Sequence, residues 1–233
     1  MISDEHKSIF IHIPKTGGVS IKYLLSKKYE YEDQEQWIED VRKKQMFAPI
    51  DHLDARESLA LYGKEKWDEY FKFAFVRNPW DLAVSLYHWE KMQINSFQKK
   101  GEHISTHRMQ PRSWEDKDKG LVFRTFNDQS LVASFNEYID NLLYENQGHT
   151  WTQTKFLINR RGNIDLDFIG RFENYEQDAQ SVIDKLNIDT EVPHKNKSDH
   201  EHYSKYYDEE TKKKVEHIFK DDIEYFKYKF ESI

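Results

Sequence analysis

The chain has 233 residues, of which 37% are hydrophobic and 33% are charged, and its formal net charge is −7. This length is enough for one α/β domain with a full core, so we expect a single domain over residues 1–233. The absence of cysteine excludes disulfides, thiolate nucleophiles and Cys-based metal sites. The acidic balance argues against a general nucleic-acid binder, although a locally positive pocket for an anionic cofactor stays compatible with it.

The first residues, MISDEHKSIF, contain no long apolar run and no signal-peptide pattern. No stretch of the sequence approaches the length of a transmembrane span. We therefore expect a cytoplasmic protein without a membrane span.

Residues 8–20, SIFIHIPKTGGVS, predict a strand, a glycine loop and the start of a helix. Pro14 ends the strand because it has no backbone donor. The loop's N–H groups, the helix dipole and a lysine together favour a phosphate or a similar anion. The loop is not a Walker A motif, because its lysine precedes both glycines. The candidate anion-binding residues are Lys15, Thr16, Gly17, Gly18, Val19 and Ser20.

A second segment, residues 72–89, has the same strand-to-helix character. A short apolar run ends at Arg77, Asn78 can cap a helix, and Pro79 suits the first helical position. Ser85 follows about two turns into that helix, so an arginine and a hydroxyl can grip one phosphate from two sides. The alternatives are a structural ion pair between Arg77 and Asp81, and a serine that only faces solvent or a neighbouring carbonyl.

The remaining elements alternate between helices and short strands. The pattern predicts helices at 34–45, 54–61, 65–71, 130–144, 174–186, 208–219 and 221–230, and further strands at 155–158 and 167–172. Residues 95–120 are polar with few apolar anchors and predict a long mobile loop, with limits near 92–125. Such alternation implies a mainly parallel sheet, in which ligands bind beyond the carboxyl ends of the strands.

The two segments together resemble the PAPS-dependent sulfotransferases. IPKTGGVS is similar to the 5′-phosphosulfate loop of that family, and FAFVRNPWDLAVSLY to its 3′-phosphate motif. The stretches HLDARESLALYGKEKWDEYFK and DFIGRFENYEQ extend the similarity, which is greatest to the carbohydrate-type branch and leaves out roughly residues 92–150.

The resemblance implies a P-loop-like, three-layer α/β/α fold with a mainly parallel central sheet. It implies PAPS (3′-phosphoadenylyl sulfate) as donor, PAP as product, and a hydroxylated acceptor, most readily a sugar. Lys15 would contact the bridging oxygen of the phosphosulfate, and Arg77 and Ser85 would bind the 3′-phosphate. A loop at residues 193–198 would close on the phosphate end of the cofactor and would contribute Lys195 and Ser198.

Transfer to a hydroxyl requires a base, and His52 is the candidate. It lies before a predicted helix, between the two phosphate motifs, where related carbohydrate sulfotransferases carry a histidine or an acidic group. A plain helix-entry histidine is the alternative reading. His12 is the next candidate, and Asp51 and Asp54 are weaker ones.

Two other functions stay open from the sequence. A nucleotide-dependent phosphotransferase is disfavoured because no Walker-type lysine follows the glycines and no acidic residue ends the second strand. A non-catalytic nucleotide- or glycan-binding protein is disfavoured because Lys15, Arg77 and Ser85 are all present. No histidine or carboxylate spacing is diagnostic of a metal, so no metal is expected. Arg171 and Glu173 are assigned a structural role first.

Overall fold

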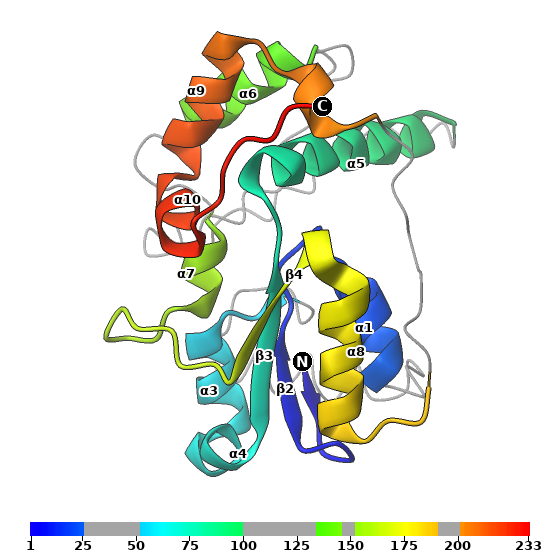
Figure 1. Ribbon diagram of the computed structural model, residues 1–233, viewed down its shortest axis with the longest axis vertical. Coiled ribbons are helices and arrows are strands. Elements are labelled where there is room, and N and C mark those ends of the chain that lie inside the picture. Colours follow the sequence, from blue (N-terminus) through cyan, green and yellow to red (C-terminus); the bar gives the residue numbers. More distant parts are fainter. Residues whose placement is uncertain (26–51, 100–133, 146–151, 191–200) are drawn as a thin grey trace. The chain divides into compact units, whose positions relative to one another are not determined.

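The structure is a computed structural model that describes residues 1–25, 52–99, 134–145, 152–190 and 201–233 (Figure 1). The described residues divide into two compact units. Unit 1 combines Met1–Arg77 with Gln153–Lys197, and unit 2 combines Asn78–Thr152 with Ser198–Ile233. Both predicted phosphate motifs begin in unit 1.

Unit 1 is built on a mixed four-stranded sheet with helices. Its elements are β1 (Ile2–Ser3), β2 (Ser8–Ile11), α1 (Gly18–Leu25), α3 (Ala55–Tyr62), α4 (Lys64–Glu69), β3 (Phe71–Val76), α7 (Gln153–Leu157), β4 (Phe168–Arg171), η5 (Phe172–Asn174) and α8 (Tyr175–Leu186). The strand order is β1-β2-β3-β4. β2, β3 and β4 pair in parallel, whereas the two-residue β1 pairs antiparallel with β2. The predicted α/β class is therefore confirmed.

The register of the parallel strands brings their carboxyl ends to one edge of the sheet. Ile11 at the end of β2 pairs with Ala74, and Val76 at the end of β3 pairs with Arg171 at the end of β4. The residues that follow these three strands consequently come together. Polar groups collect at this edge because the ladder has ended there, and ligands of parallel sheets bind at such edges.

One face of the sheet is covered by α1 and α8 (Figure 1). The buried side chains that fill this layer are Phe10, Ile21, Leu24, Leu25, Phe73, Phe75, Ala179, Val182, Ile183 and Leu186. α3 and α4 lie on the opposite side of the sheet. A β-carbon added to Gly170 of β4 would lie 2.5 Å from the ring of Phe75, so the packing of this face requires a glycine there. Burial of these large apolar side chains, each worth about 1.5–3 kcal/mol, fixes both helices on the sheet.

The start of α3 is set by a capping box. The Asp54 carboxylate accepts the backbone N–H of Glu57 at 2.7 Å, and the Glu57 carboxylate accepts the backbone N–H of Asp54 at 3.1 Å. This reciprocal pair satisfies two N–H groups that the helix cannot satisfy itself. Asp54 therefore has a structural role in this cap, and His52 lies two residues before it.

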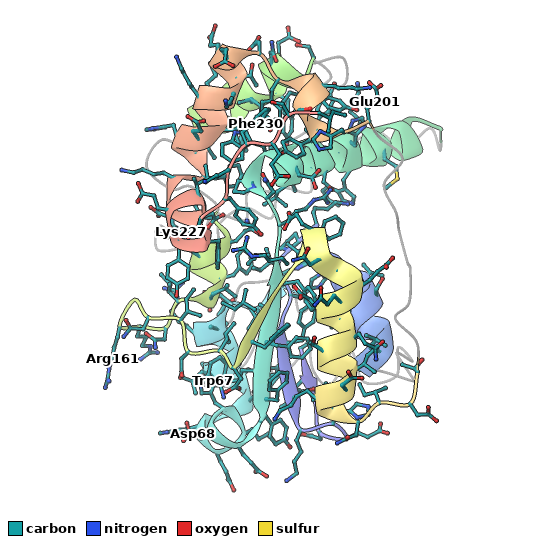
Figure 2. All side chains as sticks on the ribbon, in the orientation of Figure 1. Trp67, Asp68, Arg161, Glu201, Lys227 and Phe230 are labelled. Carbon is teal, nitrogen blue, oxygen red and sulfur yellow. The ribbon has the colours of Figure 1, made fainter. Side chains whose placement is uncertain are left out.

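Unit 2 is helical. Its elements are α5 (Pro79–Lys99), α6 (Phe135–Glu145), η6 (Tyr203–Tyr206), α9 (Glu209–Ile218) and α10 (Lys220–Phe226). As predicted, Asn78 caps α5, since its side-chain oxygen accepts the backbone N–H of Trp80 at 3.1 Å. Phe230 (Figure 2) packs edge-on against the rings of Trp80, Tyr203 and Tyr207. None of the helices in the described residues has both the length and the apolar character needed to cross a membrane.

Three predicted elements are corrected by the structure. Residues 155–158 belong largely to helix α7 rather than to a strand, and Ile158 makes only an isolated bridge with Ile164. The long loop was predicted to start near residue 92, but α5 continues to Lys99. The last helix ends at Phe226 rather than at residue 230, because Lys227 adopts a left-handed backbone conformation with φ of 59°. The predicted helix at 34–45, the helix start at 130–133 and the loop from residue 100 lie outside the described residues.

Candidate active site

The loop between β2 and α1 forms the first part of the site. Lys15 has φ of 67° and Gly17 has φ of 85°, so the chain turns through two left-handed positions before α1 begins. The Thr16 hydroxyl, which is fully buried, donates to the carbonyl oxygen of Ile13 at 2.9 Å. Thr16 therefore holds the loop together from inside, and its assignment to the anion stays a prediction.

The first turn of α1 supplies backbone donors at the end of this loop. The first N–H groups of an α-helix have no partner inside the helix, and the helix dipole adds partial positive charge at the same place. Gly18 begins α1, and Val19, which follows, is 43% exposed. Ser20 donates its backbone N–H to the carbonyl of Gly17 at 3.2 Å. Val19 can therefore contribute through its backbone, as the sequence interpretation requires.

The two glycines are required for different reasons. Gly17 needs its positive φ, and a β-carbon there would lie 2.6 Å from the ring of Tyr175. Gly18 begins a helix, but a β-carbon there would lie 1.9 Å from the ring of His12. The first glycine serves the turn and the second leaves room for an imidazole.

Arg77, at the end of β3, forms the second part of the site. The residue is 3% exposed, and its guanidinium donates to the carbonyl oxygen of Lys15 at 3.0 Å. The face of the guanidinium lies over the ring of Phe172, 4.1 Å from the ring centroid. The structure thus brings the two predicted phosphate motifs together through Lys15 and Arg77.

The backbone of Arg77 is held by a side chain that the sequence interpretation did not identify. Gln153, the first residue of α7, accepts the N–H of Arg77 at 2.7 Å and donates to its carbonyl at 2.7 Å. The side-chain amide thus makes the two backbone hydrogen bonds that a neighbouring strand would make just after β3 ends. A glutamine at this position carries no sequence signal, since only the folded topology brings it to Arg77.

The electrostatics of this edge favour an anion. Burial, reinforced by the positive charge of Arg77, lowers the pKa of Lys15 to about 8. An anion bound between these cations would oppose both effects. Two cations, a glycine loop and a helix N-terminus make a donor set that fits a phosphate or a sulfate group. Within the described residues, no group of three or more His, Asp or Glu side chains is placed to hold a metal ion.

His52 and His12 lie together beside the same loop. Their ring centroids are 4.4 Å apart, and Nδ1 of His52 is 2.9 Å from the backbone carbonyl oxygen of His12. A carbonyl oxygen only accepts, so Nδ1 carries the hydrogen in this contact. The neutral ring then has its lone pair on Nε2, which is the arrangement a general base needs. The His12 ring is buried and stacks on Phe10, at 5.4 Å between centroids.

The junction between β4 and α8 adds two aromatic residues that the sequence interpretation did not assign to the site. Phe172 supports Arg77, and Tyr175 donates its hydroxyl to the carbonyl of Gly17 at 3.2 Å. Nearby, the Arg171 backbone N–H donates to the Asp178 carboxylate at 2.5 Å, in line with the structural role expected for this segment. In the sequence, DFIGRFENYEQ is notable only for its resemblance to the family, because a contact over such a long sequence separation leaves no local pattern.

The other predicted site residues belong to unit 2 or lie outside the described residues. Ser85 belongs to α5 in unit 2 and is 2% exposed. Lys195, Ser198 and the weaker base candidate Asp51 lie outside the described residues. Their roles stay predictions.

Comparison with known proteins shows the family of this chain. The model of the sulfotransferase family matches residues 1–229. An uncharacterized protein of Archaeoglobus fulgidus is 27% identical over 133 residues, which cover 56% of this chain and 78% of that protein. Carbohydrate sulfotransferase 14 of Danio rerio is 24% identical over 195 residues, which cover 80% of this chain and 47% of that protein. The match thus spans about half of the Danio rerio protein. Because the family model covers nearly its whole length, the chain belongs to the sulfotransferase family.

Proposed function

We propose that this chain is a PAPS-dependent sulfotransferase that acts on a hydroxyl of a carbohydrate or glycoconjugate, on a P-loop-like fold. The observation that carries the proposal is the hydrogen bond of Arg77 to the Lys15 carbonyl, which holds two cationic residues beside the N-terminus of α1. Membership of the sulfotransferase family supports sulfuryl transfer. The printed name of the Danio rerio relative supports a carbohydrate acceptor.

The residues of the β2–α1 loop take the 5′ end of the donor in this proposal. PAPS supplies an activated sulfuryl group whose leaving group is a phosphate. Lys15 and the backbone N–H groups at the start of α1 would stabilise the negative charge that develops on the leaving oxygen, as an oxyanion hole does. Lys15 suits this role because burial and Arg77 disfavour its charged form, and a negative charge next to it stabilises that form.

Arg77 takes the 3′-phosphate in this proposal. Its fork of N–H donors can bind a phosphate while one of them stays on the Lys15 carbonyl. Ser85 is assigned to the same phosphate by the resemblance alone. Recognition of a 3′-phosphate would separate PAPS from ATP and GTP, which lack one.

His52 acts as the base that takes the proton of the acceptor hydroxyl. Its Nδ1 is engaged with the His12 carbonyl, so Nε2 is the nitrogen that accepts a proton. Proton transfer by a positioned histidine contributes typically about 10²–10⁴-fold to a rate.

The proposal is tested by offering the protein PAPS and a panel of hydroxylated sugars, and by measuring PAP release and sulfated product. A thermal-shift series with PAP, ATP and GTP accompanies the assay. We expect PAP to stabilise the fold by about 2.7 kcal/mol at a hundred times its Kd, with much smaller effects of ATP and GTP. Transfer from ATP instead would indicate a phosphotransferase. Tight PAP binding without transfer to any acceptor would indicate a non-catalytic binding protein.

A further inference from the structure

We propose that Tyr175 is a positioning residue whose hydroxyl orients the Gly17–Gly18 peptide, so that the Gly18 N–H faces the bound 5′-phosphate. This inference rests on the proposed function of the loop. Tyr175 is the first residue of α8, on an element far from the loop in sequence. Its hydroxyl donates to the carbonyl oxygen of Gly17 at 3.2 Å, and the Ser20 side chain hydrogen-bonds the same phenol oxygen. The phenol therefore connects the two ends of the turn that leads into α1.

The direction of the Gly17 carbonyl decides the direction of the Gly18 N–H. Peptide bonds in the described residues are trans, and in a trans peptide the C=O and the following N–H point in opposite directions. The Gly17 carbonyl accepts from Tyr175 of α8 and from the backbone N–H of Ser20, which lies within α1. The Gly18 N–H consequently points away from α1, toward the position of an anion at the helix N-terminus.

A glycine turn needs such a restraint from outside. Gly17 has φ of 85°, and glycine has more backbone freedom to lose than any other residue. The Tyr175 ring limits that freedom by contact, since its Cε2 lies 2.6 Å from where a β-carbon of Gly17 would be. The hydroxyl adds a directional bond that contact alone does not provide.

The ring and the hydroxyl of Tyr175 have separable roles. The ring packs against Phe75 and Phe172, with centroids 5.3 Å and 6.1 Å away. These ring contacts do not need an oxygen. Burial raises the pKa of Tyr175 to about 12, so its hydroxyl stays a donor at neutral pH. Tyr175→Phe therefore removes the proposed function while it keeps the packing.

The experiment compares ligands that do and do not occupy the loop. We expect Tyr175→Phe to weaken PAP binding by about three- to tenfold, the usual effect of one hydrogen bond. Binding of adenosine 3′-phosphate should stay unchanged, because that ligand has no 5′-phosphate. Amide exchange of residues 14–21 in the PAP complex should become faster in the variant, with no change in residues 71–76.

Tyr70→Phe is the matched control. Tyr70 precedes β3 at the opposite end of the same sheet, and its hydroxyl donates to Asp4 at 2.7 Å. It should leave the affinity for both nucleotides unchanged. The inference is overturned if Tyr175→Phe binds PAP as the wild type does with unaltered exchange, or if both nucleotides are weakened equally. A wild-type protein that binds no PAP would contradict the proposed function first, which is a separate result.

Discussion

The guanidinium of Arg77 donates a hydrogen bond to the backbone carbonyl oxygen of Lys15 over 3.0 Å. This bond joins the end of β3 to the loop that follows β2, although the two residues belong to separate motifs. Its carbonyl acceptor lies at a residue with φ of 67°, a conformation that a non-glycine residue adopts only at some cost. Arg77 therefore supports the shape of the loop in addition to any contact it makes with a ligand.

The first prediction concerns this double role of Arg77. Arg77→Lys keeps the charge but loses the planar fork, so one ammonium cannot serve the Lys15 carbonyl and a phosphate with the same geometry. We expect PAP affinity to fall by tenfold or more, and 5′-AMP affinity to fall by a smaller factor, in titration calorimetry. In the wild type, PAP should bind more tightly than 5′-AMP. Equal affinities of the wild type for the two nucleotides would contradict the assignment of Arg77 to the 3′-phosphate.

The second prediction concerns the charge of Lys15 during turnover. Lys15→Ala removes the ammonium next to the proposed leaving oxygen, where its effect is greatest in the transition state. We expect turnover to fall by about 10²–10³-fold, with a smaller loss of PAP affinity. Single-turnover rates with PAPS and calorimetry with PAP separate the two effects. A variant that transfers sulfate at close to the wild-type rate would remove Lys15 from the mechanism.

The third prediction is a pH dependence of nucleotide binding. Burial, reinforced by the charge of Arg77, lowers the pKa of Lys15 to about 8 in the free protein, and a bound anion should raise it again. Below pH 8 the ammonium is already formed and binding needs no proton. As the pH rises through 8, binding must take up a proton, so PAP affinity should fall by up to about tenfold per pH unit.

Lys15→Arg is the control for this pH dependence, because an arginine stays charged over the whole range. Calorimetric titrations of both proteins between pH 7 and pH 9.5 make the comparison. We expect a sloping affinity for the wild type and a flat one for the variant. The same slope in both proteins would assign the titration to another group.

The strand–loop–helix unit around Lys15 could be predicted because its signals are local. Pro14 ends a run of apolar residues, and the positive φ of Gly17 is a property that glycine supplies by itself. The same holds for Asn78, whose side chain caps α5 as expected. In a parallel sheet, the residues that follow neighbouring strands meet at one edge. The sequence therefore predicts Arg77 near the loop that follows the first strand.

The support of the site could not be predicted in this way. Tyr175 reaches Gly17 across a sequence separation of 158 residues, and Gln153 reaches Arg77 across 76. Contacts of this range depend on the packing of α7 and α8, which no local pattern encodes. The wrong strand at 155–158 has a related cause, since a short apolar run suits a buried helix turn as well as a strand.

The fourth prediction tests the contact of Gly18 with His12. Gly18→Ala would place a β-carbon 1.9 Å from the His12 ring, so the ring or the helix must move. We expect a loss of about 1–3 kcal/mol in the free energy of unfolding, the usual cost of overpacking. His12→Ala in the same background should recover part of that loss. Urea denaturation of the single and double variants measures the coupling.

Gly63→Ala is the control for that cycle. A β-carbon at Gly63 would meet no atom within 4 Å, although its φ of 85° makes any other residue strained. Its cost should therefore add to that of His12→Ala without coupling. Simple additivity of Gly18→Ala with His12→Ala would show that the ring does not set the requirement for glycine at position 18.

The last prediction concerns His52 as the base. The Nδ1 of His52 is engaged with the His12 carbonyl, so Nε2 is the nitrogen that accepts a proton, and it can do so only while the ring is neutral. Turnover should therefore rise with pH through a histidine-like value. His52→Ala should lower turnover by about 10²–10⁴-fold and abolish that rise, while PAP affinity stays close to that of the wild type. His12→Ala is the matched comparison, because it changes the neighbouring ring but keeps the carbonyl that holds Nδ1. It should lose stability through its buried contacts, yet keep the pH profile. If His52→Ala retains full turnover while a folded His12→Ala loses it, the two histidines must exchange roles.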